Sequence, residues 1–370
     1  MIKKIQKFLF DAPAWLLVLM TFALILFKTG IWYLGTEVTV RIADNPFTNP
    51  VANNPDAQYL VWNWLGPFLA WIIGAQGKFR FVLFHLCFSI AFSALFTWAV
   101  FSRFPDKIAR KSLMLFAILP VSATAYFWVG MDSITLFLML SSLIWSRLAL
   151  LLGFSLGLQH FEQGFCAIVG LLGAVVLSLR MGRPAALSLR FCMVLLAGLI
   201  LGKLFLIGLF HYYHIEVNSG RLYWILTYLK RFIRQFILHF HFIVWSILGL
   251  GWVVLLRYID LGRGALPFLI PFVFLCGFSV IVEDQTRVVC IITFPLIAVY
   301  WLFNEEFLDS IGDGELSMVF LIWAMMPWTF AWGGIPRWSA FPYDIVYVAC
   351  WIFGFRLPAD ISRWPFRTDF

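Results

Sequence analysis

Isolated acidic residues stand at the edges of apolar stretches in this sequence. Asp56 lies in "NPDAQYL", Asp132 in "WVGMDSITLFLML" and Glu162 in "LQHFEQGF". Ionisable groups so close to hydrocarbon are costly to desolvate, and they persist mainly where a partner, water or a substrate compensates that cost. A carboxylate within hydrogen-bond reach of a hydroxyl can remove its proton as a new bond forms. We therefore interpret these three acids as candidate catalytic residues, with Asp56 as the expected base.

Arginine residues occur near similar boundaries and suit an anionic substrate. Arg287 follows an acidic turn in "VEDQTRVVCIITFPLI", and Arg221 lies in "HYYHIEVNSGRLYW". Fixed cationic donors stabilise the charge that grows on a departing phosphate, and arginine is better than lysine because its planar fork matches two oxygens. We take Arg287 as the first candidate, with Arg221 and Arg337 next. Neighbouring groups expected to contact the same substrate are Tyr59, His160 and Asp284.

Each acid also has a structural interpretation, which the sequence leaves open. "NPDAQYL" suits Asp56 as a helix N-cap, and Asp132 before "SITL" is placed for the same role. Glu162 is equally compatible with a solvated loop. No metal site is predicted, because His211 and His214 lack a third ligand and the six Cys show neither a CxxC motif nor Cys/His ligand spacing. The sequence does not decide whether a divalent metal is needed.

The composition defines the class of protein that must hold these groups. The chain has 370 residues, of which 62% are hydrophobic and 12% are charged, and its mean hydropathy is +0.90. A soluble globule has too little interior to bury so much apolar surface, so we predict an integral membrane protein whose partners include membrane lipid. The net charge of +8 is spread over short loops without a long basic run, and we expect no nucleic acid partner.

Continuous apolar segments predict an all-α, polytopic bundle rather than a barrel, whose strands would alternate in polarity. We expect one integral membrane domain over residues 1–370, with about 11–12 spans of the length needed to cross ~30 Å of hydrocarbon. The expected spans are 13–34, 81–101, 112–129, 133–146, 148–159, 165–179, 191–210, 236–256, 265–282, 288–303, 316–332 and 343–355.

The positive-inside rule orients these spans. If "MIKKIQK" is cytoplasmic, the clusters "SRFPDKIARK" and "RMGRPAALSLR" reach the same side. Both termini are then cytoplasmic, in a bacterial inner or plasma membrane. Residues 35–80 form an outer loop with a Trp-rich interfacial helix at 60–75. If residues 133–159 formed one tilted helix, every later span would cross the membrane in the opposite direction, so we prefer a hairpin around Arg147.

Other polar and aromatic groups have two interpretations each. Trp62, Trp64, Trp224 and Trp338 suit stacking on sugar rings, although tryptophan also gathers at membrane interfaces. The basic cluster "KRFIRQFILHFHF" either contacts lipid phosphate or begins an amphipathic helix.

Three ionisable side chains lie inside apolar segments. Lys28 and Lys203 are expected to snorkel towards the membrane surface, and His85 is expected to be a packing residue with its polar atoms satisfied.

Together, an acid followed by Tyr in the first outer loop ("DAQY"), "GMDS" at a helix start and an Arg before a Pro-containing span ("DQTRVVCIITFPLIAVY") resemble the GT-C superfamily of integral membrane glycosyltransferases. That superfamily uses polyprenyl-phosphate-linked sugars. The resemblance, which is mannosyltransferase-like, implies that Asp56 is the first-loop catalytic acid, Asp132 a second pocket acid and Arg287 a group near the lipid phosphate. The sequence departs from the pattern in two ways: Asp44 and Asp56 are separated rather than paired, and no large soluble domain follows the last predicted span.

We therefore expect a glycosyltransferase that moves a sugar from a polyprenyl-phosphate-linked donor to a glycan or glycolipid acceptor at the extracytoplasmic face. No cofactor beyond the lipid-linked donor is expected. One alternative is a polysaccharide polymerase or ligase acting on lipid-linked sugars. Another is a lipid or solute transporter or flippase, which would predict charges at mid-membrane depth, broken helices in matched positions and an internal repeat.

Overall fold

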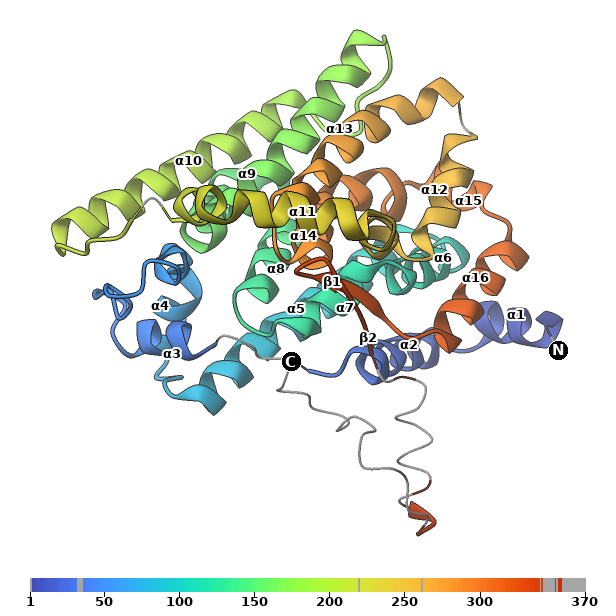
Figure 1. Cartoon of the computed structure of the whole chain (residues 1–370). Helices are drawn as coiled ribbons and strands as arrows, with labels where there is room; N and C mark the ends of the chain where they lie inside the picture. Colours follow the sequence, from blue (N-terminus) through green and yellow to red (C-terminus); the bar gives the residue numbers. More distant parts are fainter. Residues whose placement is uncertain are drawn as a thin grey trace.

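The computed structural model describes residues 2–31, 36–218, 220–260, 262–339, 341, 350 and 352–354. Within these residues the chain is all-α, as predicted, with one short β-hairpin (Figure 1). The α-helices are α1 (Ile2–Asp11), α2 (Ala14–Thr29), α3 (Thr36–Asp44), α4 (Leu65–Ile72), α5 (Lys78–Arg103), α6 (Asp106–Ile118), α7 (Pro120–Phe127), α8 (Met131–Ile144), α9 (Ala149–Arg180), α10 (Leu189–Tyr212), α11 (Arg221–Leu248), α12 (Gly251–Ile259), α13 (Leu266–Cys276), α14 (Gln285–Ile297), α15 (Glu305–Ser310) and α16 (Asp313–Met325).

Several of these helices are long and apolar enough to cross a membrane. By length and composition, four candidate spans occur in the described residues, or up to seven if each bent pair of helices forms one span. The bent pairs are α1 with α2, α6 with α7 and α11 with α12, with angles of 112°, 60° and 80°. The sequence predicted about 11–12 spans over the whole chain. The difference arises partly because breaks such as that between Ile118 and Pro120 shorten the helices, and partly because the predicted span 343–355 lies almost wholly outside the described residues.

Helix α14 occupies the middle of the bundle. Its candidate span is 89% buried, whereas those of α5 and α10 are 33% buried. Helix α14 packs against α7, α9, α11 and α13, and Phe294 lies edge-on to Phe92 of α5 with ring centroids 5.3 Å apart. Because α14 is enclosed on most sides, the polar groups at its N-terminus are held by several elements at once.

Helix α9 reverses direction at His160. This residue has φ −161° and ψ 81°, which interrupts the helix. A Cβ built on Gly164 would lie 3.6 Å from the Cβ of Leu156, whereas eight residues of straight helix span about 12 Å. The chain therefore folds back on itself, as the separation of predicted spans 148–159 and 165–179 requires. The predicted hairpin around Arg147 is also present, as the 3₁₀ turn Ser146–Leu148 between α8 and α9.

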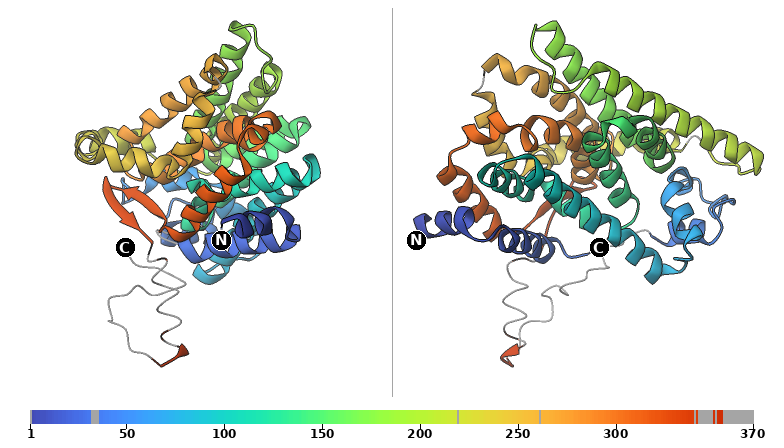
Figure 2. Two further views of the ribbon diagram at one scale, coloured as in Figure 1. Left: turned by 90° about the vertical axis from the view of Figure 1, so that its right-hand side faces the viewer. Right: turned by 180° about the vertical axis from the view of Figure 1, so that it is seen from behind.

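The first half of α9 packs on α10 through glycine. A Cβ on Gly198 would lie 2.2 Å from the carbonyl oxygen of Leu150, and one on Gly202 would lie 2.2 Å from that of Phe154. Because the contacts advance together along both helices, the two segments run in the same direction. Small residues allow such close approach of helix backbones, and Figure 2 shows α10 as a long helix along one edge of the bundle.

The segment after the first apolar helices folds into short elements, namely α3, the 3₁₀ turn η1 (Gln58–Trp62) and α4. The predicted helix at 60–75 therefore corresponds to η1 followed by α4. Its apolar side chains, including Val61 and Trp64, pack on Leu206 and Phe210 near the end of α10. This contact fixes η1 beside the reversal in α9.

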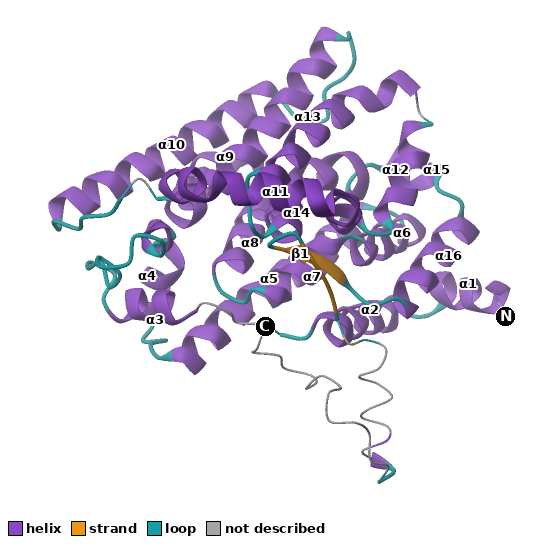
Figure 3. Ribbon diagram, in the orientation of Figure 1, coloured by secondary structure: helices purple, strands orange, loops and turns teal. Residues whose placement is uncertain are grey.

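The predicted span 316–332 is wrong in its second half. Helix α16 ends at Met325, and the strands β1 (Thr329–Trp332) and β2 (Ile335–Trp338) follow as an antiparallel hairpin, shown in orange in Figure 3. Gly333 and Gly334, with φ 60° and 72°, supply the left-handed conformation of the turn. The hairpin lies against α14, since the backbone N–H of Ala331 donates to Oγ1 of Thr286 at 2.8 Å.

Of the two lysines for which the sequence allowed snorkelling, Lys28 is buried and Lys203 is half-buried. The ammonium of Lys28 is buried, donates to the carbonyl oxygen of Trp323 and lies 4.1 Å from the ring centroid of that residue. Lys203 turns inward to the site described below. His85 is buried as predicted, and its Nδ1 lies 2.9 Å from the carbonyl oxygen of Phe81, but its Nε2 has no hydrogen-bond partner among the described residues.

Candidate functional site

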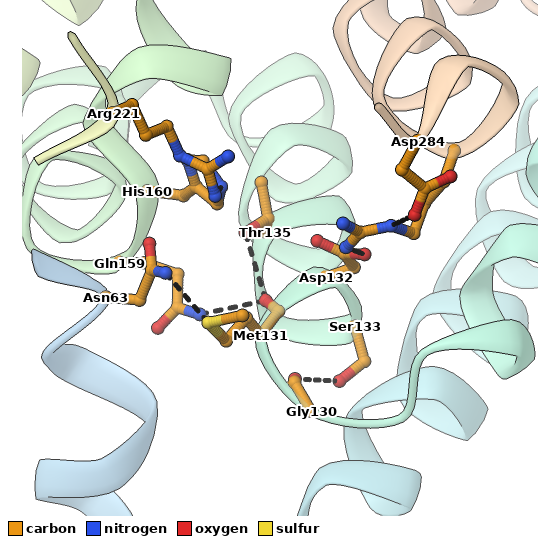
Figure 4. A network of polar contacts seen from close by, with 11 residues as sticks. Asn63, Gly130, Met131, Asp132, Ser133, Thr135, Gln159, His160, Arg221 and Asp284 are labelled. Carbon is orange, nitrogen blue, oxygen red and sulfur yellow. Dashed lines mark hydrogen bonds and ion pairs between the residues drawn. The ribbon is translucent and has the colours of Figure 1, made fainter. Parts of the chain in front are cut away.

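A cavity of about 160 Å³ opens where η1, the break in α9, the first turns of α11 and α14 and the hairpin meet. Its wall carries both signs of charge together with aromatic side chains. The ionisable and polar residues in the wall are Tyr59, His160, Glu162, Gln163, Cys166, Arg221, Glu283, Asp284 and Arg287. Figure 4 shows part of this network, with Arg221 and His160 on one side and Asp132 and Asp284 on the other.

Arg287 is held by two carboxylates. Its Nη1 donates to Asp132 of α8, and its Nε donates to Asp284, which immediately precedes α14. The guanidinium also lies over the ring of Trp128 at 4.3 Å from the centroid. Asp132 is fully buried, so its carboxylate serves Arg287 and does not face the cavity. The charge of Arg287 is thus already balanced before any substrate enters.

Arg221 is held differently. Its Nη2 lies 2.8 Å from Nε2 of His160, and its guanidinium lies over the ring of Tyr59, 4.7 Å from the centroid. Among the described residues, its approach to a carboxylate is a weak one, with 3.9 Å between Arg221 Nε and Glu162 Oε2. The cation therefore keeps most of its capacity to bind an anion.

Glu162 is surrounded by cationic and polar groups without a short hydrogen bond to any of them in the described part of the chain. Its Oε1 lies 3.9 Å from Nζ of Lys203, and its Oε2 lies 3.6 Å from Nδ1 of His160. The side chain is 36% exposed, and Nζ of Lys203 sits over the ring of Trp62 at 3.6 Å. Glu162 lies just after the reversal in α9, so it is neither buried in the bundle nor in the open loop that the sequence left as an alternative.

Asp56 lies outside the wall of the cavity. It is exposed in a turn, and its Oδ2 accepts a hydrogen bond of 2.8 Å from the hydroxyl of Tyr228 on α11. The N-cap of η1 is Ala57 rather than Asp56. Asp56 therefore ties the first loop to α11 near the cavity, while Tyr59, three residues further on, reaches the cavity itself.

Arg337 is half-buried in β2, where it pairs in register with Phe330, and it does not form part of the cavity wall. The site thus gathers most of the predicted residues but separates Asp56 and Arg337 from the rest.

The aromatic wall differs from the sequence prediction. Trp224 lines the cavity, together with Trp128 and Trp332, whose rings stack 5.2 Å apart at 10°. Trp64 is instead buried and Trp338 is exposed on the hairpin. Trp128 had a usable signal, since it stands four residues before Asp132. Trp332 had no such signal, because no acidic residue stands within ten positions of it in the sequence.

No group of three or more His, Cys, Asp or Glu side chains with the geometry of a metal site occurs among the residues that the structure describes. Independently of that finding, Arg221 and Lys203 each lie 3.9 Å from a carboxylate oxygen of Glu162, so the three groups could form an anion and proton-acceptor site.

Comparison of the chain with protein-family models, with curated proteins and with solved structures finds no match. No family is identified in this way. The several long apolar helices indicate a multi-pass membrane protein.

Proposed function

We propose that this chain is a membrane glycosyltransferase that transfers a sugar from a polyprenyl-phosphate-linked donor to a hydroxyl of a glycan or glycolipid. The observation that carries the proposal is the position of Glu162 beside Arg221 in the wall of one aromatic-lined cavity. Lys203, which lies outside that wall, and Arg221 each come within 3.9 Å of the carboxylate. Such a site offers an anion-binding cation, a proton acceptor and ring faces for a sugar within a few ångströms. The resemblance of "DAQY", "GMDS" and "DQTR" to the GT-C superfamily supports the same reaction class.

In the proposed reaction, the acceptor hydroxyl oxygen attacks the anomeric carbon of the donor sugar. The bond between that carbon and the phosphate oxygen breaks, and the bond electrons leave with the lipid phosphate. Glu162 takes the hydroxyl proton as the new glycosidic bond forms. Because the carboxylate is exposed to the cavity and makes no short hydrogen bond in the described residues, it is better placed for this step than the buried Asp132.

The leaving phosphate would be bound by Arg221 with help from Lys203. A cation already neutralised by carboxylates has little net field to offer an anion, and Arg287 is neutralised by Asp132 and Asp284. Arg221 instead faces a neutral imidazole. This assignment reverses the order expected from the sequence, in which Arg287 came first, and gives Arg287 a positioning role beneath Trp128.

The cavity would face the extracytoplasmic side, because the positive-inside rule puts Arg110 and Arg147 on the cytoplasmic side. The first half of α9 runs from Arg147 to His160, so these two residues lie at opposite ends of a helix. A reporter active only in the cytoplasm should work when fused after Arg110 and fail when fused after Gly220. The reverse pattern would contradict this orientation.

The function is tested by mass analysis of envelope glycolipids and glycans in cells that carry the chain, lack it, or carry Glu162→Gln or Asp56→Asn at matched protein levels. We expect one glycan product to disappear without the chain, to fall by about two orders of magnitude with Glu162→Gln, and to persist with Asp56→Asn. Identical glycans with and without the chain would refute the proposed function. An active Glu162→Gln with an inactive Asp56→Asn would return the role of base to Asp56.

A further inference from the structure

Helix α11 presents an unusual combination of side chains to the outside of the protein. It lies across the periphery of the bundle on α14 and the hairpin, and is seen at the left edge of the left view of Figure 2. Its inner side is anchored by Phe232, which is fully buried and whose ring lies tilted by 39° against that of Trp224, with centroids 4.7 Å apart. The opposite side is exposed over most of the segment before the irregular residue His239.

The exposed side consists of two adjacent stripes. One stripe is apolar and contains Leu222, Leu226, Ile233 and Ile237, with exposed fractions of 58%, 64%, 38% and 66%. The spacing of these residues by 4, 7 and 4 positions keeps them on one face of a helix.

The second stripe lies beside the first, with spacings of 4, 3 and 4 positions, and is polar and cationic. It contains Tyr223, Thr227, Lys230 and Arg234. Lys230 and Arg234 are exposed and form no ion pair with a carboxylate among the described residues, whereas nearby Arg231 pairs with Glu283 at 2.8 Å. The two free cations and the apolar stripe therefore face the same surroundings.

We infer that residues 222–238 of α11 form a surface that docks on anionic lipid headgroups. A helix with an apolar stripe beside Lys and Arg lies in the plane of a membrane interface, with its apolar side chains in the acyl boundary and its cations at the phosphates. The charge of Lys230 and Arg234 is complementary to anionic headgroups, and nothing in the described residues competes for it. This inference does not depend on the proposed glycosyl transfer.

The position of the surface connects it to the cavity. Trp224 and Ile225 line the cavity from the first turns of the same helix. At 1.5 Å per residue, Lys230 lies about 9 Å and Arg234 about 15 Å along the axis from Trp224. Headgroups bound on this stripe would stand next to the cavity mouth at the level of the lipid phosphates.

The test uses the purified full chain and native mass spectrometry with added dioleoyl phosphatidylglycerol or dioleoyl phosphatidylcholine. We expect the wild-type chain to retain phosphatidylglycerol in preference to phosphatidylcholine, and added salt to weaken the preference. In the double variant Lys230→Gln/Arg234→Gln, the preference for phosphatidylglycerol over phosphatidylcholine should be about tenfold smaller than in the wild type.

The matched control is Arg147→Gln/Arg190→Gln, which removes two exposed cations from other parts of the surface. Thermal melting of both variants verifies that they remain folded. Retention of the lipid preference by the control supports the inference. An equal loss in control and test variants, an unchanged preference in the test variant, or no preference in the wild type would each overturn it.

Discussion

Arg221 donates a hydrogen bond from Nη2 to Nε2 of His160, across a distance of 2.8 Å and 61 positions of sequence. A guanidinium has no acceptor, so Nε2 must carry the lone pair and the imidazole is neutral with its proton on Nδ1. Nδ1 in turn lies 3.6 Å from Oε2 of Glu162. The histidine thus orients the arginine without neutralising it, which is the condition for Arg221 to bind an anion.

The first prediction concerns this arginine. Arg221→Ala should weaken binding of the lipid-phosphate donor by about tenfold or more, because a charge-assisted hydrogen bond contributes roughly 1.5–3 kcal/mol. Arg221→Lys should recover only part of the affinity, since lysine cannot form the planar contact. Titration with the donor in detergent measures both. Arg147→Ala, at an exposed turn, is the control, and wild-type affinity in Arg221→Ala would remove this residue from the site.

The second prediction concerns the ion pair between Arg287 and Asp132. Asp132→Ala should destabilise the protein by about 3 kcal/mol or more, because it leaves part of a buried guanidinium uncompensated. The loss should appear as a lower thermal midpoint in detergent. Asp44→Ala, which removes an exposed acid of α3, serves as the control and should melt like the wild type. Equal midpoints for both variants would show that the pair does not hold α8 to α14.

The third prediction concerns the contact of α9 with α10. Gly202→Ala places a methyl group 2.2 Å from a backbone oxygen and must push the two helices apart. Gly208→Ala on the same helix meets nothing within 4 Å. We expect the first variant to lower the thermal midpoint and the second to leave it unchanged or raise it slightly. Matching behaviour of the two variants would contradict the close packing.

The fourth prediction concerns pH and the N-terminus of α16. Partial burial opposes ionisation of Asp313, but hydrogen bonds from Lys107 and Lys111 outweigh it and lower the pKa of this carboxyl below its ordinary value of 3.8. A lowered pKa in the folded state adds stability that is complete above the unfolded pKa and is lost as the pH falls through the folded one.

Asp313→Asn should therefore melt at a lower temperature than the wild type at neutral pH, and the difference should shrink as the pH falls below about 4. Glu306→Gln is the control, since Glu306 is exposed and forms no ion pair in the described part of the chain. A difference between Asp313→Asn and wild type that does not change with pH would contradict the role of the ion pairs.

The candidate site was predictable to the extent that charge is expensive in apolar surroundings. Because of that cost, Asp132, Glu162 and Arg287 could be identified from the sequence as candidate site residues. All three stand near helix ends or breaks that meet around the cavity. The desolvation cost does not show which side chains these residues contact. The pairing of Asp132 with Arg287 joins residues 155 positions apart, and local sequence carries no record of such a contact.

The helix reversal at His160 was predicted from the sequence, whereas two other features of the fold were not. The sequence predicted two spans with polar residues between them, and the reversal is present. The hairpin of β1 and β2 was missed, because "WTFAWGGIPRW" is as apolar as a membrane helix and only the Gly333–Gly334 turn distinguishes it. Lys28 was missed for a related reason, since snorkelling and burial begin from the same sequence pattern.

The sequence by itself determined the class of this protein, the all-α architecture and the identity of most charged groups at one end of the bundle, because hydrophobicity and desolvation act on each segment separately. Only the tertiary structure decided which of the two arginines is bound closely by carboxylates. Folding places two carboxylates on Arg287 and a neutral imidazole on Arg221. Charge balance in a site depends on distances between segments remote in sequence, and those distances are set by packing.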